Sequence, residues 1–193
     1  MRIISKVQMQ QMLAAIHPHE DLFGMRDRAM LVLDYHTGLR VSELVGLSVD
    51  DVSCNGIPRQ TLHVRASIAK YAHGRDIPLN VCAQEAIQAI LRFNKAHGFS
   101  VAPGAPLLVS KYHQHISARY VQLLVARLRK KAGLDVPATP HALRHGFASR
   151  FVEKTGNALI AKQLLGHRRL ETVSIYAHTS PEQLAAAVSL LAG

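Results

Sequence analysis

Residues suited to phosphodiester chemistry occur at six points along this chain. They are Arg40, Lys70, His141, Arg144, His167 and Tyr176. Cleavage of a phosphodiester needs fixed donors for the charge that builds on the phosphoryl oxygens, and a proton for the leaving oxygen. Guanidinium groups are charged, bidentate donors, and histidine or lysine can move the proton. A tyrosine nucleophile would keep the phosphate covalently attached, which makes the step reversible without ATP.

The first arginine is expected at a junction between two helices. The segment TGLRVSEL follows a predicted helix over residues 25–36, which stops at Gly38, and leads into a predicted helix over residues 41–46. Arg40 therefore lies between the two helices, with Glu43 close behind it.

The lysine is expected in the loop of a hairpin. From residue 47 to residue 79 the pattern changes to strands: residues 62–66 alternate apolar and polar, and DIPL follows the segment KYAHGR. This pattern predicts a small antiparallel hairpin with Lys70 in its loop. Pro78 marks the last strand as an edge or a strand end.

Helices are expected over most of the remaining chain. Their approximate ranges are 6–16, 82–97, 117–132, 140–155, 157–166, 170–178 and 181–191. Gly166 is expected to end the helix that precedes His167. The fold class is therefore mostly α with a small antiparallel β-sheet, an α+β protein.

Length and charge narrow the class of protein. The 193 residues suffice for one domain with a core, and no apolar run is long enough to cross a bilayer. The two cysteines stand apart, and the N-terminus lacks a secretory pattern, which together predict a cytoplasmic protein without disulfides. The net charge of +10 favours a polyanionic partner, either nucleic acid or an anionic membrane surface. No Lys or Arg follows Arg169, so the last segment is expected to be a packing element or a protein-contact element.

Four of the candidates also have an interpretation other than phosphodiester chemistry. Arg40 alone suits a helix-end arginine paired with a nearby carboxylate, and Lys70 suits a loop lysine that binds phosphate without catalysis. His141 and His145 could suggest a metal pair, but the glutamate of an HExxH motif is missing, so we expect no metal; His145 is expected to be structural. Tyr176, in a predicted helix, would usually be a core aromatic. Only the ordered set favours chemistry.

In that order, the residues resemble those of the tyrosine recombinases, the lambda-integrase or phage integrase family of site-specific DNA recombinases. The matching motifs are TGLRVSEL with Arg40 and Glu43, KYAHGRDIPL with Lys70 and Pro78, HALRHGFA with His141 and Arg144, LLGH with His167, and IYAH with Tyr176. The resemblance covers nearly all of residues 5–180. Six ordered positions in five motifs make it specific, whereas a lone His-x-x-Arg would be weak.

Two features depart from the family's usual pattern. Ala69 and Tyr71 flank Lys70 where relatives usually have glycines, so the Lys70 assignment rests on spacing. Most relatives also carry an N-terminal helical domain that clamps the other side of the DNA, and only a short leader precedes the catalytic region here. We therefore expect an excised catalytic domain or a naturally short recombinase, similar to the fimbrial inverters.

The resemblance implies the fold of a tyrosine-recombinase catalytic domain and a defined reaction. Tyr176 would attack a DNA phosphate, forming a 3'-phosphotyrosyl link and expelling a 5'-hydroxyl. Arg40 and Arg144 would hold the non-bridging oxygens, with His167 as a further donor.

The resemblance also implies the proton donors and the partners. His141 would be the acid/base partner and Lys70 the acid for the leaving oxygen, with no metal, cofactor or ATP. Double-stranded DNA is the implied partner, with a homotetramer on two DNA sites and a monomer free in solution as an alternative state. Residues 1–180 would form the catalytic domain, and 181–193 a tail helix that contacts a neighbouring subunit or its own.

Three other functions remain open on these residues. The chain could be a DNA-binding accessory protein of the same fold that no longer cleaves. It could be a topoisomerase IB-like enzyme that nicks and reseals DNA without site specificity. A phosphodiesterase or metal hydrolase is the most distant alternative.

Overall fold

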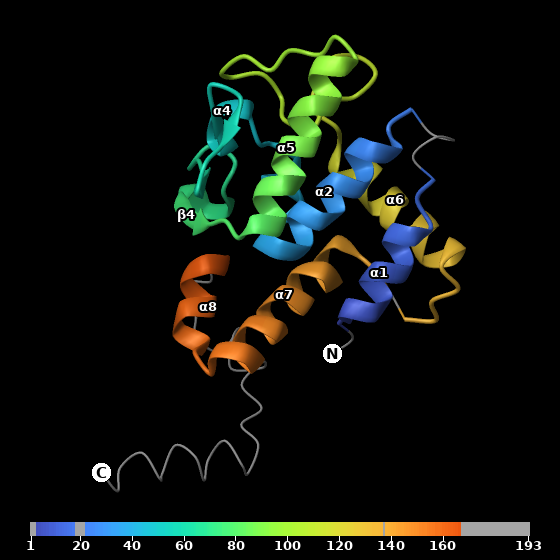
Figure 1. Ribbon diagram of the computed structural model, residues 1–193. Helices are drawn as coiled ribbons and strands as arrows, with labels where there is room; N and C mark the ends of the chain where they lie inside the picture. Colours follow the sequence, from blue (N-terminus) through green and yellow to red (C-terminus); the bar gives the residue numbers. More distant parts are fainter. Residues whose placement is uncertain (1–2, 18–21, 137, 167–193) are drawn as a thin grey trace, which may run out of the picture. The chain divides into compact units, whose positions relative to one another are not determined.

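Two helices distant in sequence form the centre of the first unit of the structure. The computed structural model describes residues 3–17, 22–136 and 138–166. It divides into one compact unit of residues 1–147 and a second that begins at Ala148. Helix α2 (Gly24–Thr37) packs along helix α5 (Val81–Ala96) in the first unit (Figure 1).

Three further helices of this unit pack together. Helix α6 (Ala118–Lys131) packs against α1 (Lys6–Ala14) and against α3 (Val41–Val45). Helix α6 has an apolar stripe that is buried, which fixes the face that it turns to the core; its members are Val121, Leu124, Val125 and Leu128. The chain is therefore mostly helical, as the sequence predicts.

Side chains and backbone geometry at the helix ends explain where the helices begin and stop. Ser5 caps α1, with Gln8 completing a capping box, and Asn80 caps α5. Gly38 follows α2 with φ 62°, a left-handed conformation that glycine adopts without steric cost. The predicted stop at Gly38 is confirmed, and the chain turns there towards Arg40.

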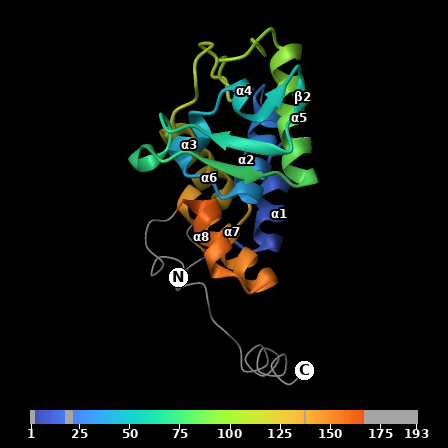
Figure 2. The same ribbon diagram turned by 90° about the vertical axis from the view of Figure 1, so that its left-hand side faces the viewer.

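Two small antiparallel hairpins lie beside α5 and α2, on the side that faces the viewer in Figure 2. The first pairs β1 (Ser53–Cys54) with β2 (Ile57–Pro58). The second pairs β3 (Thr61–Val64) with β4 (Arg75–Pro78) and is the predicted hairpin, with Leu62 and Val64 buried. Its loop contains a short 3₁₀ helix over Lys70–Ala72.

One part of the strand prediction is wrong. Residues 49–52, which were expected within the strand region, form a helical turn, α4 (Val49–Val52). Ser48 and Asp51 cap each other there, because a short hydroxyl and a carboxylate can satisfy the unpaired N–H groups of a helix start. Ala66, expected to alternate with the buried strand residues, lies beyond β3 and is exposed.

Helix α7 (Pro140–Thr155) continues from the first unit into the second, which also contains α8 (Ala158–Leu165). Thr139 accepts a hydrogen bond from the backbone N–H of Ala142 at the start of α7. Gly166 ends α8 with φ 63°, as predicted. The helices expected over 170–178 and 181–191, and the boundary expected after residue 180, lie outside the described residues.

Neither cysteine forms a disulfide: Cys54 and Cys82 are both free and exposed. Within the described ranges, no helix is long and apolar enough to cross a membrane.

Candidate active site

The candidate site is built around Glu43, whose side chain is fully buried in the first turn of α3. The backbone N–H of Arg40 donates to Glu43 Oε2 at 2.8 Å, and Arg40 Nη1 donates to Glu43 Oε1 at 2.8 Å. The pairing that a helix-end arginine would make is therefore present. It also fixes Arg40 where α2 gives way to α3, with 21% of its side chain exposed.

Arg144 reaches the same carboxylate from α7. Its Nη1 donates to the backbone oxygen of Gly38 at 2.6 Å and lies 3.9 Å from Glu43 Oε2. Burial, followed by repulsion from Arg40, lowers the pKa of Arg144 to about 9, while attraction to Glu43 opposes that change. The guanidinium still carries its charge at neutral pH. The two predicted arginines thus meet at one carboxylate.

A third arginine, absent from the sequence prediction, completes the cluster. Arg75 Nη1 donates to Glu43 Oε1 at 2.9 Å, and its Nη2 donates to Glu43 Oε2 at 2.8 Å. This parallel, two-point pairing is the strong geometry of arginine with a carboxylate. A signal for it exists in the sequence: Arg75 and the buried Ile77 are two residues apart in one strand, so they share a face.

Arg75 and Arg40 determine the ionisation of Glu43. Burial alone would raise the pKa of this carboxyl, but hydrogen bonds from Arg75 and Arg40 outweigh it and lower the pKa to about 2. The cluster therefore sets three positive charges against one negative charge at neutral pH. Such a surplus suits the binding of an anion.

Asp34 of α2 is a second buried carboxyl near the cluster. Neither of its oxygens has a hydrogen-bond partner among the described residues. Burial raises the pKa of Asp34 to about 8, against the attraction of Arg144 and together with repulsion from Glu43. The carboxyl is therefore mostly protonated at neutral pH and adds little negative charge to the site.

His141 and His145 lie one turn apart on α7. Their Nε2 atoms are 2.5 Å apart, and the two rings meet edge to face. Desolvation, followed by repulsion from Arg144 and Arg40, lowers the pKa of His141; desolvation and repulsion from His141 lower that of His145 to about 4. Both rings are therefore neutral at neutral pH, a state in which one ring can donate to the other.

Among the described residues, no third metal-ligating side chain joins this pair. No group of three or more metal-ligating side chains occurs in the part of the chain that the structure describes.

The remaining predicted residues have more limited placement. Lys70 begins the 3₁₀ helix in the β3–β4 loop, and its residue is exposed. His167 and Tyr176 lie outside the described residues. The structure thus brings Arg40, Glu43 and Arg144 together and places Lys70 on the hairpin that also carries Arg75.

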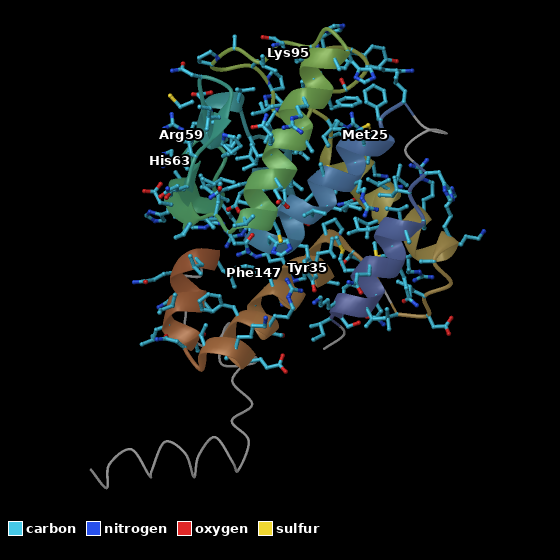
Figure 3. All side chains as sticks on the ribbon, viewed as in Figure 1. Met25, Tyr35, Arg59, His63, Lys95 and Phe147 are labelled. Carbon is cyan, nitrogen blue, oxygen red and sulfur yellow. The ribbon has the colours of Figure 1, made fainter. Side chains whose placement is uncertain are left out.

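The β3–β4 hairpin has an exposed outer face, opposite to the face that carries Arg75. His63 is exposed and its Nδ1 lies 2.6 Å from Asp76 Oδ1, across the strand pair. Figure 3 shows His63 and Arg59 at the outer edge of the hairpins. Arg75, one residue from Asp76, points to the opposite face, because successive side chains in a strand alternate.

Comparison with curated proteins finds tyrosine recombinases that are similar to this chain over most of its length. The tyrosine recombinase XerC of Methylobacterium sp. (strain 4-46) is 36% identical over 162 residues, which are 84% of this chain and 48% of that protein. XerC of Vibrio parahaemolyticus serotype O3:K6 (strain RIMD 2210633) is 37% identical over 169 residues, 87% of this chain and 52% of that protein. The chain spans about half the length of the curated relatives it matches.

Solved structures share the fold. The XerH site-specific recombinase bound to its difH substrate in a pre-cleavage complex has a TM-score of 0.77 at 21% identity, over 99% of this chain and 54% of that chain. The Tn1549 transposon integrase in complex with a circular intermediate DNA has a TM-score of 0.78 at 22% identity, over 97% and 65%. The family pattern of phage integrases matches residues 2–183. The chain accordingly belongs to the phage integrase family, in which its similar curated proteins are tyrosine recombinases.

Proposed function

We propose that this chain is a site-specific DNA recombinase that cleaves and rejoins DNA through Tyr176. The observation that carries the proposal is the convergence of Arg40 and Arg144 on one buried carboxylate. These are the two arginines that the family resemblance assigns to the phosphate. The similar solved structures of a recombinase and an integrase in complex with DNA support DNA as the partner.

In the proposed reaction, the phenolic oxygen of Tyr176 attacks a DNA phosphorus. A bond forms between phosphorus and the tyrosine oxygen, and the bond to the 5'-oxygen breaks. The tyrosine loses its proton, and the leaving oxygen gains one. Arg40, Arg144 and His167 stabilise the charge on the non-bridging oxygens, where fixed cationic donors have their largest effect.

The two proton transfers require separate groups. His141 is proposed as the acid/base partner of the nucleophile; its lowered pKa keeps the ring neutral and able to accept a proton at neutral pH. The ammonium group of Lys70, at the end of a flexible side chain, is proposed as the acid for the 5'-oxygen. The arginines provide positive charge that a metal ion provides in other phosphoryl-transfer sites.

Rejoining reverses the same step with a different strand. The 5'-hydroxyl of a partner DNA attacks the phosphotyrosyl bond and restores the tyrosine, so no ATP is consumed. Two rounds of exchange between two sites imply four nucleophiles, and we propose a homotetramer on DNA. Residues 1–180 are proposed to form the catalytic domain, and 181–193 a tail that contacts protein.

The test is capture of the covalent intermediate. DNA fragments that flank the gene are made with a nick in the cleaved strand, a short distance 3' of each candidate cleavage site, so that the short strand with the leaving 5'-hydroxyl diffuses away and the adduct cannot reseal. Wild type should form a protein–DNA adduct that resists denaturation and persists in chelator, and Tyr176→Phe should form none. Equal trapping by Tyr176→Phe would refute the assignment of the nucleophile.

Other outcomes identify the alternative functions. Salt-dependent DNA binding without an adduct in either protein indicates a non-catalytic accessory protein. Relaxation of supercoiled plasmid without any site requirement indicates a topoisomerase IB-like enzyme. Loss of activity in chelator indicates a metal-dependent hydrolase.

A further inference from the structure

Arg75 differs from the two predicted arginines in its exposure and in its geometry. Its side chain is 9% exposed, against 21% for Arg40, and Glu43 between them is fully buried. Arg75 also takes both carboxylate oxygens with two nitrogens, whereas one side-chain nitrogen of Arg40 reaches one of them. Arg75 is thus the structural partner of the carboxylate, and Arg40 is the partner nearer to solvent.

The pairing of Arg75 with Glu43 limits the geometry in which the same carboxylate can pair with the Arg40 guanidinium. A carboxylate and a guanidinium pair most strongly through two parallel hydrogen bonds. Without Arg75, the Glu43 carboxylate could take that two-point geometry with Arg40. The planar guanidinium of Arg40 would then turn inwards. With Arg75 in place, Glu43 binds Arg40 end-on through Nη1.

The strand pairing determines where Arg75 lies. Arg75 is opposite Val64 in the β3–β4 register. A Cβ on the preceding Gly74 would meet the Val64 carbonyl oxygen at 2.8 Å, so the two strands approach closely at this point. The loop that carries Lys70 therefore ends at Arg75, where close pairing with β3 fixes the position of β4.

The start of the loop is anchored in a similar way. Arg65 Nε donates to Asp51 Oδ1 at 2.7 Å, and Arg65 Nη2 donates to the Gly46 carbonyl at 3.0 Å. Arginines on both sides of the Lys70 loop thus pair with acids just before or after the α3–α4 connection. The Arg75 pairing is the one that includes Arg40.

We propose that Arg75 is a positioning residue for phosphate binding: by occupying Glu43 from β4, it holds the Arg40 guanidinium in the orientation that receives the scissile phosphate. The inference rests on the proposed function. It assigns Arg75 no contact with DNA and no proton transfer. It differs from a purely structural role because the defect of an Arg75 variant should depend on the charge of the phosphate.

The experiment compares wild type, Arg75→Gln, Arg75→Lys and the control Arg92→Gln, which changes an exposed arginine of α5. Each protein is given two nicked DNA substrates in single-turnover reactions. One has the ordinary scissile phosphate; in the other, a methyl group replaces a non-bridging oxygen and removes the negative charge. DNA affinity and urea unfolding are measured for every variant.

On the ordinary substrate, Arg75→Gln should form the adduct about 100-fold more slowly than wild type, the usual effect of losing one oriented donor to a phosphoryl or acyl oxyanion. Arg75→Lys should recover only part of this rate, because an ammonium lacks the planar fork. On the methyl-substituted substrate, the gap should shrink to about tenfold or less, since Arg40 no longer meets a charged oxygen. The control should match wild type in both reactions.

A second variant tests the anchor from the side of the carboxylate. Glu43→Gln/Arg75→Gln removes the carboxylate together with its two-point partner, so the charges of Arg40 and the buried Arg144 lose Glu43. It should unfold at lower urea than Arg75→Gln and still cleave slowly, because Arg40 has lost its ionic anchor.

Three results would overturn the inference. If Arg75→Gln cleaves like wild type, or if its defect is equal on both substrates and follows its loss of stability, Arg75 has no positioning role. Cleavage by Glu43→Gln/Arg75→Gln at the wild-type rate would also show that Arg75 has no positioning role. Absence of an adduct with wild type is a different failure, since it overturns the proposed function and this inference with it.

Discussion

Replacement of Glu43 by glutamine should destabilise the fold by an amount that the site geometry predicts. The wild-type carboxylate accepts four hydrogen bonds, two from Arg40 and two from Arg75. Glutamine has nearly the same shape, but one of its two polar ends is an NH₂ donor. Two of the four contacts would therefore place a donor against a donor in a buried site.

The pKa of the Glu43 carboxyl sets the magnitude of the expected loss in unfolding free energy. Glu43 has a pKa of about 2 in the folded protein, against 4.5 for an ordinary glutamate. At about 1.4 kcal/mol per pKa unit, this difference stabilises the folded state by roughly 3 kcal/mol at neutral pH. Removal of one partner of a buried ion pair costs a similar amount, about 3–5 kcal/mol.

The pH dependence provides an internal check. Because the folded pKa is depressed, the stabilisation is complete above pH 4.5 and is lost as the pH falls towards 2. The unfolding free energy of Glu43→Gln should thus fall below that of wild type by roughly 3 kcal/mol at pH 7 and by roughly 2 kcal/mol at pH 3.5. Urea unfolding followed by circular dichroism at both pH values measures the difference.

Glu85→Gln is the matched control, because this glutamate is exposed on α5. It should change the unfolding free energy by about 0.5 kcal/mol or less. A Glu43→Gln loss below about 1 kcal/mol, the usual range of an exposed ion pair, would show that the carboxylate does not hold the arginines together. A loss that is the same at both pH values would refute the depressed pKa.

Three further predictions concern Asp34, the hairpin glycines and His141. Asp34 has a raised pKa, so its folded state keeps a proton that the unfolded state releases; stability should fall between pH 4 and pH 8 by up to about 1.4 kcal/mol per pH unit, and Asp34→Asn should remove that slope in urea unfolding. Gly74→Ala should cost about 2 kcal/mol because its Cβ meets a strand carbonyl at 2.8 Å. Gly56→Ala, with open space but φ +77°, should cost about 1 kcal/mol. By NMR, His141 should titrate below pH 6.5, and Arg40→Gln should raise that midpoint.

Each of these has a contradicting result. An unchanged slope in Asp34→Asn would mean that another group binds the proton. Equal stability of Gly74→Ala and wild type would mean that the hairpin can separate at that point. A midpoint for His141 that does not move in Arg40→Gln would mean that the two side chains are not electrostatically coupled.

Local sequence was sufficient for the elements that carry the site. Gly38 stops α2 and Gly166 ends α8, as predicted, because these ends depend on backbone geometry within a few residues. The β3–β4 hairpin follows from alternation of Leu62 and Val64. The turn at 49–52 was missed, since a four-residue helix has too little periodicity to distinguish it from a strand.

The sequence by itself determined the family, the mostly helical fold with small antiparallel sheets, and the ordered set of candidate residues. Only the tertiary structure decided that Arg40, Arg75 and Arg144 share one buried carboxylate, and that Asp34 is buried beside them without a hydrogen-bond partner among the described residues. Caps and periodicities are short-range properties, which a chain displays in its own order. Charge pairing and desolvation depend on distances between segments far apart in the chain, and packing alone sets those distances.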